Sequence, residues 1–170
     1  MLKFLGMLLL TGCCLRLGLE KAQSLVRRAE TLETWQAALG LLTGEMAFRM
    51  PDMPALLEGL SQRAGSPAAE TFAAAAKGMK RLGEHSFAEI WCNALEVNCD
   101  ALDGEDRATL ARLGNVLGRY GWEDQCQAVE SVARDLGERA GQARTQLGRE
   151  GKAYGTLGLA LGAFLSILLL

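Results

Sequence analysis

One histidine and two cysteines stand at seven-residue intervals, and their side chains are among the common ligands of zinc. The residues are His85, Cys92 and Cys99. Seven residues of helix rise about 10 Å along the axis, whereas zinc ligands lie within about 2.3 Å of the ion. Neighbouring members of this trio therefore cannot share one metal. We expect a residue beside a helix cap and two buried thiols instead.

The sequence supports a catalytic motif no better than it supports a zinc site. Gly151 and Lys152 resemble part of a phosphate-binding loop, but no glycine stands five residues earlier and Ala153 replaces the hydroxyl residue that would bind magnesium. The single histidine has no serine or cysteine in a recognisable triad arrangement. Adjacent acids such as Glu123 and Asp124 are typical of a solvated helix start. We therefore predict a protein that is not an enzyme and that binds no cofactor and no metal.

The composition predicts that helices position these residues. The 170 residues include only 3 prolines and few aromatic side chains, and Ala, Leu, Glu, Arg and Gln, which are helix formers, dominate. The net charge of -2 argues against a nucleic-acid-binding surface. The 5 cysteines are scattered without the spacing of a disulfide framework, which favours a reducing compartment.

Both ends of the chain are apolar, and the sequence between them is polar. Residues 1–19 and 153–170 are nearly free of charge, and each would form a helix of roughly 27 Å, close to the ~30 Å core of a bilayer. A lone apolar segment in lipid must be helical, because its backbone groups have to bond to one another. We therefore expect transmembrane helices at 1–19 and 153–170 and a cytoplasmic helical bundle domain at 20–152.

Basic residues flank both apolar stretches on the side of the central domain. Only Lys3 lies on the other side, so the positive-inside rule places the domain in the cytoplasm and both ends across the membrane. The flanking basic residues are Arg16, Lys21, Arg27, Arg28, Arg144, Arg149 and Lys152.

A different topology follows if the first stretch is a lipoprotein signal. Residues 10–13, Leu-Thr-Gly-Cys, match a bacterial lipobox, in which the cysteine is lipidated after cleavage and the domain lies outside the cytoplasm. Against this, the apolar run before Cys13 is very short, and apolar residues continue through Leu19. The alternative function would be a lipidated extracytoplasmic helical binding module anchored through Cys13.

Apolar residues recur at three- and four-residue steps after the first stretch, which predicts an amphipathic helix to about Phe48. Pro54 fits the first turn of a short second helix, and residues 68–82 form an alanine-rich third helix that Gly83 terminates. The expected apolar positions of the first two helices are Leu25, Leu32, Trp35, Leu39, Leu42, Met46, Leu56, Leu57 and Leu60.

Three further helices follow. Ser86 begins one with a capping-box pattern, Asp103 begins the next, which residues 118–121 close, and Trp122 begins the last, which runs into the second apolar stretch. Short connections between about six helices predict an all-α fold, a compact antiparallel helical bundle whose first and last helices extend into transmembrane helices. The expected apolar positions are Ile90, Trp91, Leu95, Val97, Leu110, Leu113, Val116, Leu117, Val129, Val132, Leu136 and Leu147.

Small residues form a stripe in the second apolar stretch. Gly158, Gly162 and Ser166 stand four residues apart and would let another membrane helix approach closely. Gly6 and Gly12 could supply facing contacts from the first stretch. The alternative is that these glycines are background, since glycine is common in membrane helices.

A leucine–glycine pair, a glycine-containing turn and a glutamine follow one another between Leu113 and Gln125. In this pattern the chain resembles stage III sporulation protein AB of endospore-forming bacteria. Leu117, Gly118 and Gln125 match the family, whereas Gly121 stands where the family commonly has an aspartate. The similarity extends over the whole chain, mostly as helix-packing patterns.

The resemblance implies a membrane platform of a sporulation-specific, secretion-like channel, with a domain similar to the type II secretion F platform protein. It implies a place in the outer forespore membrane, with the domain in the mother-cell cytoplasm. It also implies docking of a secretion-type ATPase, stage III sporulation protein AA, and of other stage III membrane proteins, as needed for forespore development after engulfment. Whether the chain also forms a homo-oligomer is left open. The candidate interaction or packing residues are Leu117, Gly118, Gln125, Gly158 and Gly162.

Overall fold

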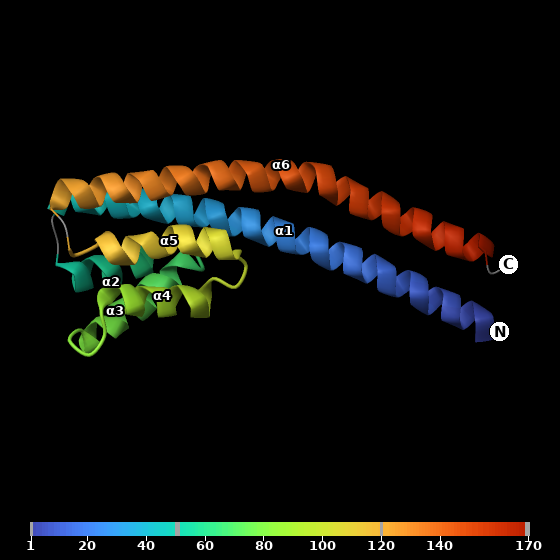
Figure 1. The fold of residues 1–170 in the computed structure, drawn as a ribbon, viewed down its shortest axis with the longest axis horizontal. Coiled ribbons are helices and arrows are strands. Elements are labelled where there is room, and N and C mark those ends of the chain that lie inside the picture. Colours follow the sequence, from blue (N-terminus) through green and yellow to red (C-terminus); the bar gives the residue numbers. More distant parts are fainter. Residues whose placement is uncertain (1, 50–51, 120, 169–170) are drawn as a thin grey trace. The chain divides into compact units, whose positions relative to one another are not determined.

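The fold is all-α, as predicted. The computed structural model describes residues 2–49, 52–119 and 121–168, and side chains within them at residue 16 and at 20–47, 52–119 and 121–149. These residues form six α-helices and one short 3₁₀ helix (Figure 1). The elements are α1 (Leu2–Arg49), α2 (Met53–Arg63), α3 (Ala68–Gly78), η1 (Met79–Arg81), α4 (Phe87–Asn98), α5 (Gly104–Val116) and α6 (Trp122–Leu168).

The chain divides into two units. One unit, residues 30–140, contains α2 to α5 and the adjoining parts of α1 and α6, and the other combines residues 1–29 with 141–170. Residues 30–140 hold 10 Lys and Arg against 18 Asp and Glu, a net charge of −8. The terminal unit holds 8 Lys and Arg against 2 Asp and Glu, a net charge of +6. The small net charge of the whole chain therefore conceals two units of opposite sign.

Three aromatic side chains from three helices form the centre of the bundle unit. Trp35 on α1 packs edge-on against Phe72 on α3 and Trp91 on α4, with ring centroids 5.6 and 6.1 Å apart. Phe72 and Trp91 close the triangle at 5.9 Å. All three rings are fully buried, and burial of such large apolar surfaces is the main driving force for a core of this size.

The predicted apolar positions of the first helix are confirmed as core. Leu32, Leu39, Leu42 and Met46 are fully buried with Trp35, so the three- and four-residue periodicity identified the buried face of α1. Leu56, Leu57 and Leu60 of α2 are buried as well.

The predicted signals at the starts of α2, α4 and α5 are confirmed. The hydroxyl of Ser86 accepts the N–H of Glu89 at 3.3 Å, and the Glu89 carboxylate accepts the N–H of Ser86 at 3.0 Å, which completes the capping box of α4. Asp103 caps α5 by accepting the N–H of Asp106 at 2.8 Å. Pro54 lies in the first turn of α2.

The third helix was predicted to run to Leu82, which is wrong. The α-helix ends at Gly78, and η1 tightens the chain until the N–H of Leu82 donates to the carbonyl of Met79 at 3.1 Å. A side chain at Gly78 would collide with Ile90 on α4, so the two helices come too close for the third helix to carry a larger residue there. Gly83 takes a φ of 112°, which fits its predicted role at the end of this segment.

Val97 was predicted to lie on the apolar face of α4, which is also wrong. Its side chain is 80% exposed, whereas Trp91, Ala94 and Leu95 are buried. Val97 follows Leu95 by two residues, a rotation of about 200° around a helix, so it points away from the buried face.

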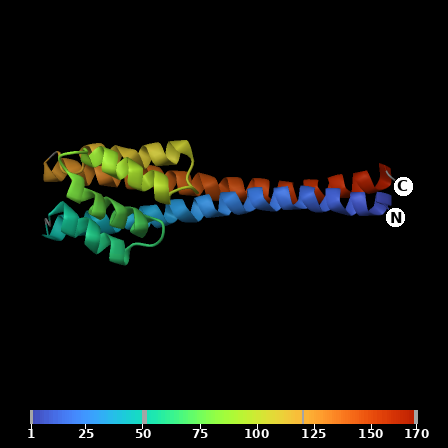
Figure 2. The same ribbon diagram turned by 90° about the horizontal axis from the view of Figure 1, so that it is seen from below.

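The terminal unit consists of two antiparallel helical segments, residues 2–29 of α1 and 141–168 of α6, which lie side by side in Figures 1 and 2. Leu25, Ala29 and Ala143 are buried there. Within the described part of the chain, no helix combines the length and the apolar character that a membrane span requires. The side chains of the two predicted spans lie outside the described residues apart from residue 16, so these spans stay a prediction.

Candidate interaction sites

The turn between α5 and α6 brings together three residues that the sequence singled out. Leu117 is buried, and Gly118 adopts a φ of 79°, in the left-handed region that favours glycine. The N–H of Gly118 donates to Oε1 of Gln125 at 3.1 Å, and the N–H of Gln125 donates to the carbonyl of Gly121 at 3.1 Å. The glutamine at the start of α6 therefore holds the end of α5 in place.

This geometry supports a structural role for Gln125, because its side-chain oxygen accepts a bond from its own chain. A direct contact of Gln125 with a partner stays a prediction. Gly158 and Gly162 belong to the helical backbone of α6, but their surroundings lie outside the described residues. Their predicted packing against another helix is therefore still a prediction.

The histidine–cysteine trio occupies three different environments. Nδ1 of His85 lies 3.4 Å from Oε2 of Glu89 in the capping box, Cys92 is half-buried, and Cys99 is fully buried. Among the described side chains, no three metal-ligating residues gather at one point.

Cys99 belongs to a buried polar chain that sequence reasoning missed. Its sulfur lies 3.6 Å from the hydroxyl of Thr71, and this hydroxyl donates to the carbonyl of Pro67 at 3.0 Å. The Thr71 hydroxyl has one proton, which it can direct to this carbonyl or to the sulfur, and the thiol can in turn donate to the hydroxyl. The indole N–H of Trp35, which makes no hydrogen bond of good geometry among the described residues, lies near the sulfur. Burial raises the pKa of the Cys99 thiol, and the contacts with Thr71 and Trp35 oppose the rise.

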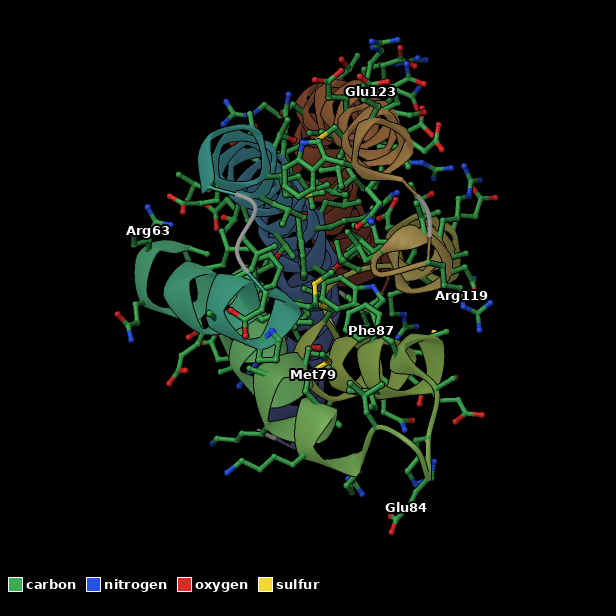
Figure 3. The ribbon with its side chains drawn as sticks, turned by 90° about the vertical axis from the view of Figure 1, so that its left-hand side faces the viewer. Arg63, Met79, Glu84, Phe87, Arg119 and Glu123 are labelled. Atoms are coloured by element: carbon green, nitrogen blue, oxygen red, sulfur yellow. The ribbon has the colours of Figure 1, made fainter. Side chains whose placement is uncertain are left out.

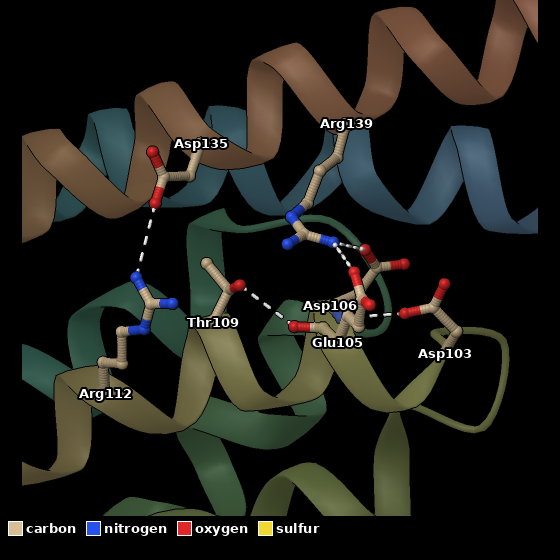
Figure 4. Close-up of polar contacts among 7 residues, drawn as sticks. All are labelled: Asp103, Glu105, Asp106, Thr109, Arg112, Asp135 and Arg139. Carbon is tan, nitrogen blue, oxygen red and sulfur yellow. Dashed lines mark hydrogen bonds and ion pairs between the residues drawn. The ribbon is translucent and has the colours of Figure 1, made fainter.

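A charged cluster joins α5 to α6 (Figure 4). Arg139 on α6 donates to Oε2 of Glu105 at 3.1 Å and to Oδ1 of Asp106 at 3.4 Å. Asp106 is fully buried, whereas Glu105 is exposed. The hydrogen bond with Glu105 is the main cause that raises the pKa of Arg139. The acids at this helix start looked only like complements of the helix dipole, because their partner lies more than thirty residues away in sequence.

A groove of about 510 Å³ lies between α4 and α5. Small residues of α5 leave it open, and one wall carries a carboxylate. Its lining includes Cys92, Leu95, Glu96, Arg107, Ala108 and Ala111. Residues 87–98 of α4 contain no Lys or Arg, so this helix contributes only negative charge to the surface. The lack of Lys and Arg in α4 could have indicated a negatively charged surface on this helix from the sequence alone.

The outer face of α1 carries no charge over three turns. Leu41 is 38% exposed there, and a side chain at Gly40 or Gly44 would meet nothing within 4 Å. Such glycines weaken a helix by about 1 kcal/mol each relative to alanine, and no packing within the described chain compensates. The face consists of Ala37, Gly40, Leu41, Gly44 and Ala47.

Comparison with known proteins identifies the family. A search of curated proteins found no match. A solved structure entitled "Stage III sporulation protein AB (SpoIIIAB)" superimposes with a TM-score of 0.62 at 18% sequence identity, over 71% of this chain and 96% of that one. This likeness shows a common fold. The family pattern described as stage III sporulation protein AB matches residues 3–170. The chain therefore belongs to the stage III sporulation protein AB family.

Proposed function

We propose that this chain is a non-enzymatic membrane platform of the sporulation apparatus, needed for forespore development after engulfment. Residues 1–19 and 153–170 anchor it as membrane helices in the outer forespore membrane. The bundle lies in the mother-cell cytoplasm, where it docks the secretion-type ATPase, stage III sporulation protein AA, and neighbouring stage III membrane proteins. Membership of a sporulation protein family supports the process, and the arrangement of charge supports the platform.

The division of charge between the two units carries the proposal. The terminal unit, with a net charge of +6, holds both apolar stretches and the basic residues that follow or precede them. Basic residues beside apolar helices favour the cytoplasmic leaflet, whose lipids are anionic. The bundle unit, with a net charge of −8, would be repelled by the same leaflet. This pattern suits a domain that faces the cytoplasm and presents its surface to proteins.

A topology measurement tests the anchoring. A reporter inserted after Gly83, in the exposed connection between α3 and α4, should be active only in its cytoplasmic form. A reporter active only outside the cytoplasm, together with loss of residues 1–12, would overturn the platform and establish the lipidated alternative at Cys13. The variant Cys13→Ser is the matched control, because it blocks lipidation and should leave the predicted topology unchanged.

A second measurement tests the docking. The full-length chain, co-expressed with the AA-type ATPase in membranes, should retain the ATPase through solubilisation and purification. A correctly oriented chain that retains no ATPase would refute docking while leaving the anchoring intact.

A further inference from the structure

The connection between α3 and α4 holds an apolar side chain out in solvent. Leu82 is 49% exposed, although backbone hydrogen bonds connect the residues around it. The N–H groups of Glu84 and His85 both donate to the carbonyl of Arg81 at 3.1 Å, and Gly83 turns the chain with its positive φ. Figure 3 shows Glu84 at the outer end of this connection, away from the helices. Leu82 is therefore presented by a defined turn.

Cations flank this leucine. Lys77, Lys80 and Arg81 are exposed, and none of them forms an ion pair within the described part of the chain. Nearby, the Glu89 carboxylate accepts the N–H of Ser86 in the cap of α4 and lies beside Nδ1 of His85. With the exposed carboxylates of Glu84 and Glu89 counted against Lys77, Lys80 and Arg81, this segment carries a net charge of +1, in a unit whose net charge is −8.

The groove between α4 and α5 has the complementary character. Leu95, Ala108 and Ala111 supply the apolar part of its lining, and its volume of about 510 Å³ exceeds what a leucine side chain needs. Glu96 lines the α4 wall, and Asp100 is exposed just beyond the end of that helix. Arg107, the only cation of the lining, is half-buried on the α5 side and forms no ion pair with Glu96 in the described structure.

We propose that copies of this chain assemble head to tail, with Leu82 of one copy seated in the α4–α5 groove of the next. Lys80 and Arg81 then face Glu96 and Asp100 of that next copy. The tip and the groove are different surfaces, so the contact is heterologous and leads to a ring or an open filament rather than a closed two-fold dimer. The inference does not depend on the proposed function, because it needs neither the ATPase nor a particular membrane topology.

A native cysteine in the groove makes the contact measurable. Cys92 lines the groove, so Leu82→Cys places a second thiol at the tip, where oxidation of the purified full-length chain should join neighbouring copies. The expected result on a non-reducing gel is a ladder of dimers, trimers and larger species, well above that of the oxidised wild-type chain. Adding Cys92→Ser should return the pattern to the wild-type background.

Two controls separate this contact from random collisions. Val97→Cys adds an exposed thiol on α4 that points away from the core but belongs neither to the tip nor to the groove lining, and it should give no ladder. In the Leu82→Cys chain, Arg81→Glu should lower the ladder about threefold, and Glu96→Arg should restore it, with the whole signal weakening at high salt.

Three outcomes would overturn the proposal. These are an unchanged ladder after Cys92→Ser, a dimer as the largest species, and a ladder from Val97→Cys as strong as that from Leu82→Cys.

Discussion

The backbone N–H of Gly118 donates a hydrogen bond to Oε1 of Gln125 at 3.1 Å, across the turn that joins α5 to α6. Seven residues separate the two, and the bond lets a side chain of one helix satisfy the backbone beyond the end of the other. The leucine before this glycine is buried, so the turn is fixed from the core side as well. The leucine–glycine pair and the glutamine that suggested the family therefore stabilise the reversal of the chain between α5 and α6.

Gly118→Ala should lower the free energy of unfolding by about 1 kcal/mol, because a φ of 79° is costly for any residue with a side chain. Chemical denaturation of the full-length chain measures the change. Gly121→Ala is the matched control, because a side chain there would make only an ordinary contact, 3.7 Å from Asp124. Equal stability of the two variants would contradict the role of the left-handed conformation.

Arg139→Met should destabilise the bundle by about 2 kcal/mol, because it removes a charge-assisted bond to the fully buried carboxylate of Asp106. Arg112→Met is the comparison. It removes a solvent-exposed pair with Asp135 at 3.5 Å and should change the free energy of unfolding by less than about 1 kcal/mol. Denaturation curves that place both variants together would show that burial of Asp106 has no energetic weight.

The Cys99 thiol should make stability fall in mildly alkaline solution. Burial raises its pKa above the ordinary 9.0, so the unfolded chain loses this proton at a lower pH than the folded chain does. The contribution is complete below pH 9.0 and is lost as the pH rises toward the pKa of the folded thiol. Cys99→Ser, which keeps a hydroxyl beside Thr71 but does not titrate there, should show a smaller decline above pH about 9. Parallel pH profiles for both proteins would contradict the assignment.

Gly40→Ala and Gly44→Ala should each raise the free energy of unfolding by about 1 kcal/mol, because both glycines face open space on a helix. Gly114→Ala provides the contrast. A side chain there would approach the backbone of Ala88 within 3.1 Å and Trp91 within 3.0 Å, so the variant should lose stability. Failure of the first two variants to stabilise the purified chain would contradict the open space that the structure shows beside Gly40 and Gly44.

Local chemistry explains why most element starts could be predicted. The capping residues Ser86 and Asp103 act within three residues of themselves, and Pro54 acts within its own turn, so the sequence contains both partners of each interaction. The buried face of α1 follows from periodicity for the same reason. The end of α3 at Gly78 was not predicted, and the close approach of Gly78 to Ile90 could not be, because it joins residues of two different helices.

The candidate sites divide in the same way. Leu117, Gly118 and Gln125 could be found together because they are close in sequence. The pair of Arg139 with Asp106, the contact of Cys99 with Thr71 and the α4–α5 groove each join residues from separate helices, and nothing in a local pattern specifies such pairs. The exposure of Val97 was foreseeable in principle, because its angular position on α4 already opposes that of Leu95.

The aromatic triangle gives this protein a selective optical signal. All three tryptophans, Trp35, Trp91 and Trp122, belong to residues 30–140, and the terminal unit contains none. Trp35 and Trp91 lie 6.1 Å apart at an interplanar angle of 80°, close enough for their excited states to couple. Tryptophan fluorescence, excited at wavelengths where tyrosine does not absorb, therefore reports on the bundle alone, whereas far-ultraviolet circular dichroism sums the helices of both units. Melting curves recorded by the two methods should thus distinguish a chain that unfolds as one cooperative body from one whose ends remain helical after its core has opened.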